Sequence, residues 1–188
     1  MTLLETPQAG RYGVIMADPP WLWRARTKEH NERSAASHYP VMDLDAIKAL
    51  PVADIAAKDC ALFLWVTDPL LPEGLETMKA WGFTFKTVAF YWTKRNRDGS
   101  PFAGMGYWTR ANPEQCLLGV RGRPVRQAKD VRRWIDAPRR EHSRKPDLAR
   151  ARIERLMGLD VPRLEMFSRA SAGGWDAWGF DVGQFDPR

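Results

Sequence analysis

The five residues from Ala17 to Trp21 combine a carboxylate, a rigid turn and an aromatic ring, which together could hold a flat heterocyclic base. They follow an apolar run at 12–16, which predicts a buried strand. Pro19 and Pro20 must end that strand, because proline has no N–H to give to a neighbouring strand, and Pro19 also restricts the residue before it. We therefore expect Asp18 at the carboxyl edge of a sheet, where open α/β sheets bind ligands.

This turn could activate an exocyclic amine towards a methyl donor. The amino group of adenine is a poor nucleophile, since its lone pair is delocalised into the ring. The Asp18 carboxylate and the Pro19 carbonyl could each accept one amine hydrogen, which would free the lone pair. Trp21 could stack on a base that has left its duplex or is already unpaired. In-line placement of the donor then supplies much of the rate, and no strong general base is needed. A plain turn with Trp21 packed on the core is the alternative.

Composition favours a globular protein with a polyanionic partner. The chain has 188 residues, of which 44% are hydrophobic, enough for one domain with a substantial core. The net charge is +6 and the pI is about 9.6, which points first to nucleic acid, with a merely soluble basic protein as the alternative. Some of the nine tryptophans are candidates for stacking on bases.

Several other classes find no support in the sequence. No apolar run approaches membrane-spanning length, and the first ten residues do not resemble a signal peptide. Cys60 and Cys116 both lie in apolar runs, which predicts small core residues in a reducing cytosol. No cluster of His and Cys has metal-ligand spacing. We therefore expect a cytoplasmic protein without a metal site.

Alternating patterns along the chain predict an α/β domain with a largely parallel sheet. We expect strands at 12–16, 61–66, 83–92, 115–120 and 164–167, and helices at 44–50, 70–81 and 146–157. The strand at 115–120 should run antiparallel to its predecessor. The polar stretch 24–39 predicts a long loop leaving the site.

Two further stretches could bind ligands. The basic stretch 121–145 ends in a candidate phosphate-binding loop, with a solvated surface as the alternative. Within it, His142 alone favours a structural or surface role. The short turn from Phe167 to Ser171 could let backbone N–H groups approach the carboxylate or ribose of a donor. A plain strand-to-loop turn is the alternative, since the chain has no Gly-x-Gly-x-x-Gly motif.

With these residues in place, the chain resembles the β-class adenine N6-methyltransferases. This is the family of the catalytic subunit of the eukaryotic mRNA N6-adenosine methyltransferase, and it has bacterial and phage members. Blocks at 14–21, 62–67, 106–117 and 139–169 carry the resemblance, in family order and along nearly the whole chain.

The resemblance implies one methyltransferase domain over residues 1–188 with a Rossmann-like class I fold. The sheet would be mostly parallel with helices on both faces, and permuted, so that the catalytic strand precedes the cofactor strand. The donor would be S-adenosylmethionine. DNA is the favoured substrate because the compact chain has no RNA-specific module, and RNA stays open.

The resemblance also implies residue roles. Catalytic positions are Asp18, Pro19, Pro20 and Trp21. Substrate-binding positions are Trp21, Tyr39, Asn112 and Glu114. To these the charge of the basic loop, rather than the resemblance, adds Arg139, Arg140, His142, Ser143, Arg144 and Lys145. Cofactor positions are Asp18, Phe167, Ser168, Arg169, Ser171, Gly179, Phe180 and Asp181. The last three residues depart from the family's Gly-Asn-Glu or Gly-Asn-Gln triplet, because Phe180 replaces an amide while Asp181 keeps an acceptor.

Other readings stay open. The chain could be a catalytically silent, nucleic-acid-binding partner subunit, which Phe180 favours and the intact Asp18 and Trp21 oppose. It could also be a relative that modifies glutamine or cytosine, although Trp21 points to adenine. The sequence does not decide between a monomer, a homodimer and a chain with a partner subunit.

Overall fold

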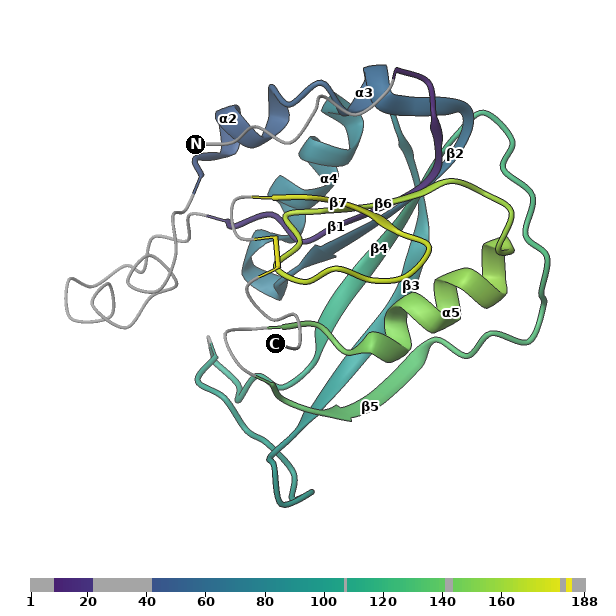
Figure 1. Cartoon of the computed structure of the whole chain (residues 1–188). Helices are drawn as coiled ribbons and strands as arrows, with labels where there is room; N and C mark the ends of the chain where they lie inside the picture. Colours follow the sequence, from purple (N-terminus) through teal and green to yellow (C-terminus); the bar gives the residue numbers. More distant parts are fainter. Residues whose placement is uncertain (1–8, 22–41, 107, 141–143, 180–181, 184–188) are drawn as a thin grey trace.

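The fold is a seven-stranded sheet between two layers of helices (Figure 1). The computed structural model describes residues 9–21, 42–106, 108–140, 144–179 and 182–183. The strands are β1 (Tyr12–Ala17), β2 (Ala56–Val66), β3 (Thr84–Arg95), β4 (Glu114–Arg121), β5 (Trp134–Pro138), β6 (Arg163–Met166) and β7 (Asp176–Trp178). The helices are α2 (Leu44–Lys48), α3 (Val52–Ile55), α4 (Leu71–Ala80) and α5 (Asp147–Met157), with a 3-10 turn η2 (Asp68–Leu70).

The strand order is β5-β3-β4-β2-β1-β6-β7. β4 runs antiparallel to β3, as expected from the sequence, and also to β2, and the other pairings are parallel. The predicted α/β architecture with a mostly parallel sheet is confirmed.

Two apolar clusters form the core, one on each face of the sheet. Ile15 and Ala17 of β1 pack with α2, α3 and α4, whereas Val14 and Met16 pack with α5 on the other face. Figure 1 shows the same division, with α5 alone on its side of the sheet. β1 is therefore buried along its whole length, as expected of a parallel strand covered on both faces.

Local signals place most elements, with shifts at their ends. Asp43 caps α2 through a hydrogen bond from the Ala46 N–H (2.8 Å) to its carboxylate, as its residue type favours. β2 begins at Ala56, five residues before the predicted start, because Ala56 pairs with Tyr12 of β1. The exposed Lys58 and Asp59 hide this first part from an apolar pattern.

β5 lies inside the basic stretch, where no strand was predicted. Ile135 is its one fully buried side chain, and the exposed Trp134 hides the period-two alternation of the strand from an apolar pattern. The strand forms by pairing with β3, and the Arg152 guanidinium donates hydrogen bonds to the carbonyls of Arg132 (2.7 Å) and Trp134 (2.6 Å). Tertiary contacts therefore override a weak local pattern.

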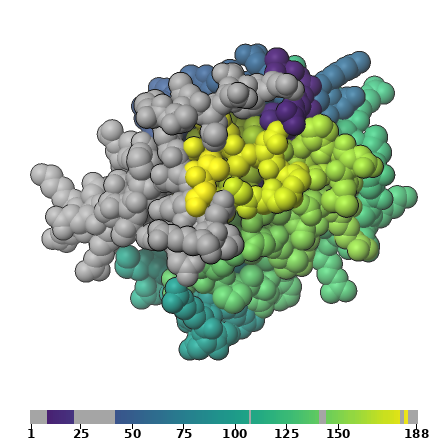
Figure 2. Space-filling model, in the orientation of Figure 1, coloured from purple at the N-terminus to yellow at the C-terminus, as the bar shows by residue number. Residues whose placement is uncertain are grey.

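The two ends of the described chain meet on one face. The Tyr12 hydroxyl donates to Asp176 (2.7 Å), and Arg11 pairs with the same carboxylate (3.1 Å). Figure 2 shows the purple start of the chain against the yellow C-terminal segment. Cys60 and Cys116 are buried and free, as predicted. None of the helices in the described ranges is both long and apolar enough to cross a membrane.

Candidate active site

The carboxyl ends of β1 and β6 meet at one edge of the sheet, because the two strands are parallel neighbours. Ala17 pairs with Met166, so Asp18 and Phe167 leave the sheet side by side. A cavity of about 40 Å³ lies there. Its walls are Met16, Asp18, Trp65, Arg144, Lys145, Arg150, Glu165, Phe167, Ser168, Arg169 and Ala170.

Hydrogen bonds fix the turn that carries Asp18. The backbone N–H of Trp21 donates to the Pro19 carbonyl (2.8 Å), and the Met42 N–H donates to the Pro20 carbonyl (3.0 Å). The Trp21 indole N–H donates to the Trp65 carbonyl (3.2 Å), while the ring packs partly on the core. A carbonyl oxygen has two lone pairs, so that of Pro19 can accept a second hydrogen bond.

A row of four side chains with alternating charges leads inward from Asp18. The Lys145 Nζ lies 2.9 Å from Asp18 Oδ2 and 3.1 Å from Glu114 Oε2, and the Lys94 Nζ lies 2.5 Å from Glu114 Oε1. The side chains of Lys145 and Glu114 are only 12% and 11% exposed. Partners this deeply buried depend on one another, because removing one leaves an unpaired charge in the interior.

Within the same row of charges, the pKa values of Asp18 and Glu114 are shifted in opposite directions. Burial raises the pKa of Asp18 above its usual value, and Lys145 offsets this only in part. Burial acts on Glu114 in the same direction, but Lys145 and Lys94 outweigh it and lower the pKa of Glu114 to about 2. Burial opposes the charge of Lys145, yet Asp18 and Glu114 hold its pKa well above the usual range. Glu114 and Lys145 therefore stay ionised, whereas burial works against the charge of Asp18.

The turn after β6 is bent and tied to β7. Phe167 has φ +62°, a left-handed conformation that non-glycine residues rarely adopt. Its ring meets that of Trp178 edge-on, with centroids 5.4 Å apart. The Ser168 N–H donates to the Trp178 carbonyl (3.2 Å), and its hydroxyl donates to the Ala170 carbonyl (2.7 Å). Backbone strain of this kind clusters at ligand sites.

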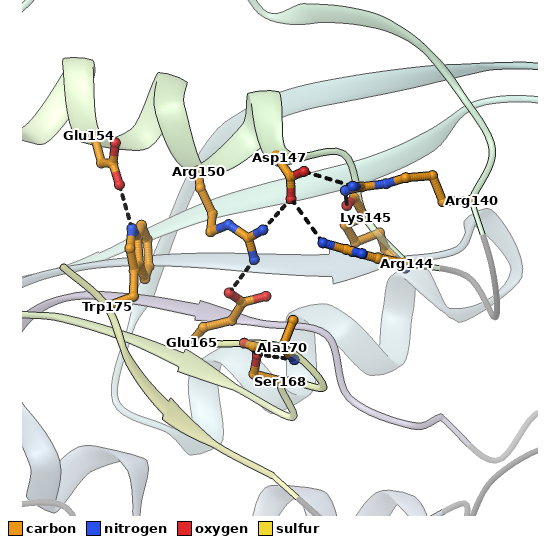
Figure 3. A network of polar contacts seen from close by, with 10 residues as sticks. All are labelled: Arg140, Arg144, Lys145, Asp147, Arg150, Glu154, Glu165, Ser168, Ala170 and Trp175. Carbon is orange, nitrogen blue, oxygen red and sulfur yellow. Dashed lines mark hydrogen bonds and ion pairs between the residues drawn. The ribbon is translucent and has the colours of Figure 1, made fainter. Parts of the chain in front are cut away.

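An arginine network backs the cavity at the start of α5 (Figure 3). Arg140 (2.7 Å), Arg144 (3.8 Å) and Arg150 all pair with Asp147, the first residue of the helix. Arg150 also pairs with Glu165 of β6 (2.8 Å). The network thus fixes α5 against β6, the strand that leads to the turn at 167–171.

Comparison with known proteins decides the family. The MT-A70 family model matches residues 12–181. The chain belongs to the MT-A70 family. The Type II methyltransferase M.MunI of Mycoplasma sp is 33% identical over 189 residues, which cover 92% of this chain and 78% of the relative. The N(6)-adenosine-methyltransferase MT-A70-like protein of Arabidopsis thaliana is 34% identical over 179 residues, which cover 88% of this chain and 23% of the relative. The human N(6)-adenosine-methyltransferase catalytic subunit METTL3 is 32% identical over 174 residues, which cover 88% of this chain and 27% of the relative.

The resemblance inferred from the sequence is therefore confirmed, and with it the enzyme class, an N6-adenine methyltransferase. Of the residues expected at the site of this MT-A70 chain, the structure brings one set together around the cavity: Asp18, Arg144, Lys145, Phe167, Ser168 and Arg169. Ser171 is exposed and does not line it. Tyr39, His142, Ser143, Phe180 and Asp181 lie outside the described residues.

Asn112 has a structural task at the foot of a loop. Its Oδ1 accepts the Lys94 N–H (2.7 Å), and its Nδ2 donates to the carbonyls of Lys94 (3.1 Å) and Phe102. Its amide therefore holds the loop that follows β3, and its predicted contact with the substrate stays a prediction. Arg140 also donates to the carbonyl of Lys145 (2.6 Å), so it positions that residue's backbone.

Sequence reasoning missed five residues of the site. Four of them line the cavity, and the fifth pairs with Glu114: Met16, Trp65, Arg150, Glu165 and Lys94. Three of them lie near the ends of β1, β2 and β6, so their position at the carboxyl edge was the signal available. Trp65 has a further property, since its buried indole N–H has no hydrogen-bond partner in the described part of the chain.

Gly179, which follows β7, lies against the backbone of the turn at 167–171. A Cβ on Gly179 would lie 2.6 Å from the Ser168 carbonyl oxygen and 2.9 Å from its nitrogen. We expect Gly179→Ala to force the turn apart, lower stability by about 2 kcal/mol and weaken donor binding. Thermal unfolding and calorimetric titration with S-adenosylmethionine measure both effects. Gly173→Ala is the matched control, since a Cβ there meets nothing within 4 Å. Equal behaviour of the two variants would contradict the close approach.

Proposed function

We propose that this MT-A70 chain transfers the methyl group of S-adenosylmethionine to the exocyclic amine of adenine in DNA. One observation supports this most directly. The carboxylate expected to hold the target amine, Asp18, and the turn expected to hold the donor, Phe167 to Ala170, form walls of the same cavity. Donor and acceptor could therefore meet there without either element moving far.

The polar groups of the cavity suit the amino-acid end of the donor. Lys145 offers a cation for a carboxylate, and Asp18 offers a carboxylate for an ammonium group. The buried indole N–H of Trp65, which lacks a partner among the described residues, offers a further donor. The cavity of about 40 Å³ is far smaller than the ~300 Å³ of ordinary ligand sites. We therefore expect Lys145 to leave Asp18 for the ligand when the site fills.

The chain's own groups would then act on the target amine. When bound, S-adenosylmethionine supplies an electrophilic methyl carbon on a positively charged sulfur. One oxygen of Asp18 and the carbonyl oxygen of Pro19 each accept one amine hydrogen, which keeps the nitrogen's lone pair out of conjugation with the ring. Trp21, held by the carbonyl of Trp65, offers its exposed side to the base. Because burial raises the pKa of Asp18, its carboxylate can also take the surplus proton.

DNA is preferred because M.MunI, which the match covers over most of its length, is named as a Type II methyltransferase and not, like the other relatives, as an adenosine methyltransferase. RNA is the second candidate, since other relatives are named adenosine methyltransferases, although the chain spans only about a quarter of METTL3. A silent partner subunit is disfavoured, because the turn carrying Asp18 and Trp21 is complete and ordered by hydrogen bonds.

Transfer of radiolabelled methyl groups to matched DNA and RNA oligonucleotide pools tests the proposal. We expect label in DNA, recovered as N6-methyldeoxyadenosine when the digested nucleosides are identified by mass spectrometry. Label in RNA alone would overturn the choice of DNA, and label on cytosine would overturn the choice of adenine. No transfer and no calorimetric binding of millimolar S-adenosylmethionine would favour the silent partner.

A further inference from the structure

A second, larger cleft lies on the other side of Glu114 from the cofactor cavity. Its volume is about 330 Å³, and its walls are Trp92, Lys94, Arg97, Phe102, Glu114, Arg139 and Arg140. Glu114 belongs to this cleft, whereas its partner Lys145 belongs to the cofactor cavity, and their charged atoms lie 3.1 Å apart. The two spaces are therefore adjacent and share one ion pair as a partition.

Three segments that are distant in sequence build the cleft. They are the end of β3 together with the loop after it, the first residue of β4, which forms part of the floor, and the residues that follow β5. Asn112 holds the loop to Lys94, and the Arg139 N–H donates to the Arg95 carbonyl (2.9 Å). Backbone contacts thus set the distance between the two walls.

Arg139 is held in a defined pose on one wall. The carbon of its guanidinium lies 3.9 Å from the centroid of the Phe102 ring, and its Nη2 donates to Asn96 Oδ1 (3.3 Å). A guanidinium carries several N–H donors in a fixed plane, so these contacts leave it able to bind an anion as well. Phe102, which is partly exposed, adds apolar surface next to that charge.

The charge of the cleft is strongly positive. Four cationic side chains and one carboxylate line it. The carboxylate pairs with Lys94 (2.5 Å) and Lys145 (3.1 Å), and Arg140 pairs with Asp147 outside the cleft (2.7 Å). A volume near the lower end of ligand-site sizes, with cations beside aromatic rings, fits one nucleotide of a single strand.

We infer that this cleft binds the nucleotide next to the target adenine, with its phosphodiester on Arg139 and its base or sugar against Phe102. This inference rests on the proposed function, since the neighbour is defined by an adenine at Asp18. Three ion-pair contacts of 2.5 to 3.1 Å connect Asp18, through Lys145 and Glu114, to Lys94 at the floor of the cleft. The cleft is therefore close enough to Asp18 to receive the adjoining nucleotide of the same strand.

Binding of a fluorescein-labelled, single-stranded 12-mer tests the inference without requiring catalysis. The probe is thymidine throughout with one central deoxyadenosine. We expect Arg139→Ala to weaken binding about 10-fold and to reduce the slope of log Kd against log salt by about 0.7, as loss of one phosphate contact should. Arg139→Lys, which keeps the charge but cannot lie flat on Phe102, should fall in between. Arg155→Ala removes an equally charged but exposed side chain on the far end of α5 and should bind like wild type.

A neutral linkage identifies the phosphate. Versions of the 12-mer carry one methylphosphonate, either 5′ or 3′ to the adenine. For wild type, one of the two modified strands should bind about 10-fold more weakly than the unmodified strand. For Arg139→Ala, the same modified strand and the unmodified strand should bind equally well. Equal losses in both proteins, or a wild-type salt slope in Arg139→Ala, would overturn the inference. If wild type binds the strand but transfers no methyl group, the proposed function fails while the binding data still decide the cleft. Thermal unfolding of every variant, Phe102→Leu included, separates lost contacts from lost folding.

Discussion

Asp18→Asn is expected to lower the rate of methyl transfer about 1000-fold while the protein still unfolds cooperatively. Asparagine keeps the shape of the side chain but loses the charge that accepts the amine hydrogen and the surplus proton. Removing one preorganised electrostatic contact to a reacting group typically costs a factor of this size. The measurement is single-turnover transfer of labelled methyl groups to an adenine-containing DNA pool at saturating donor.

Asp130→Asn is the matched control for this experiment. Asp130 also pairs with a cation, Arg155, but both side chains are more than 60% exposed and far from the cavity. Its removal should leave the rate unchanged. A wild-type rate in Asp18→Asn would show that the carboxylate does not take part in the reaction.

Glu114→Gln is expected to remove about 3 kcal/mol of stability at pH 7, and less as the pH falls. The pKa of Glu114 is about 2 in the folded protein against an ordinary value of 4.5. A carboxyl with a lowered pKa stabilises the fold above its unfolded pKa, and this stabilisation is lost as the pH falls through the folded pKa. The difference between wild type and variant should therefore shrink between pH 4.5 and 2, to about half its size by pH 3.

Urea unfolding of both proteins at a series of pH values between 7 and 3 measures this difference. Glu76→Gln is the control, since Glu76 also forms an ion pair, with Lys48, but its side chain is 62% exposed. It should change stability by less than about 0.5 kcal/mol. A difference for Glu114→Gln that does not depend on pH would mean that Lys145 and Lys94 do not stabilise this carboxylate.

The features that local chemistry determines were predictable from the sequence. Two prolines after an apolar run end β1 and place Asp18 at the sheet edge whatever surrounds them. The ends of α5 follow from equally local signals, Pro146 before the helix and Gly158 after it. β5 was not predictable, because its pairing with β3 and the support of Arg152 outweigh a pattern with one buried residue.

Contacts between distant residues explain what the sequence left out of the site. Lys94 and Glu114 are separated by 20 positions, and no motif joins them. The amide of Asn112 suits a base edge as well as a backbone, and only the fold shows that it is used at the foot of a loop. Trp65 looks like any core residue of an apolar strand until its indole N–H proves to lack a partner among the described residues.

The row of alternating charges from Asp18 to Lys94 has a consequence for the order of events. Lys145 contacts both carboxylates, so a ligand that draws it away from Asp18 also changes how firmly Glu114 holds Lys94 at the neighbouring cleft. Two binding events joined through one ammonium group cannot be independent, and thermodynamic linkage makes their influence on each other equal in both directions. Through these ion pairs, binding of the methyl donor beside Asp18 would change the affinity for the strand at the neighbouring cleft.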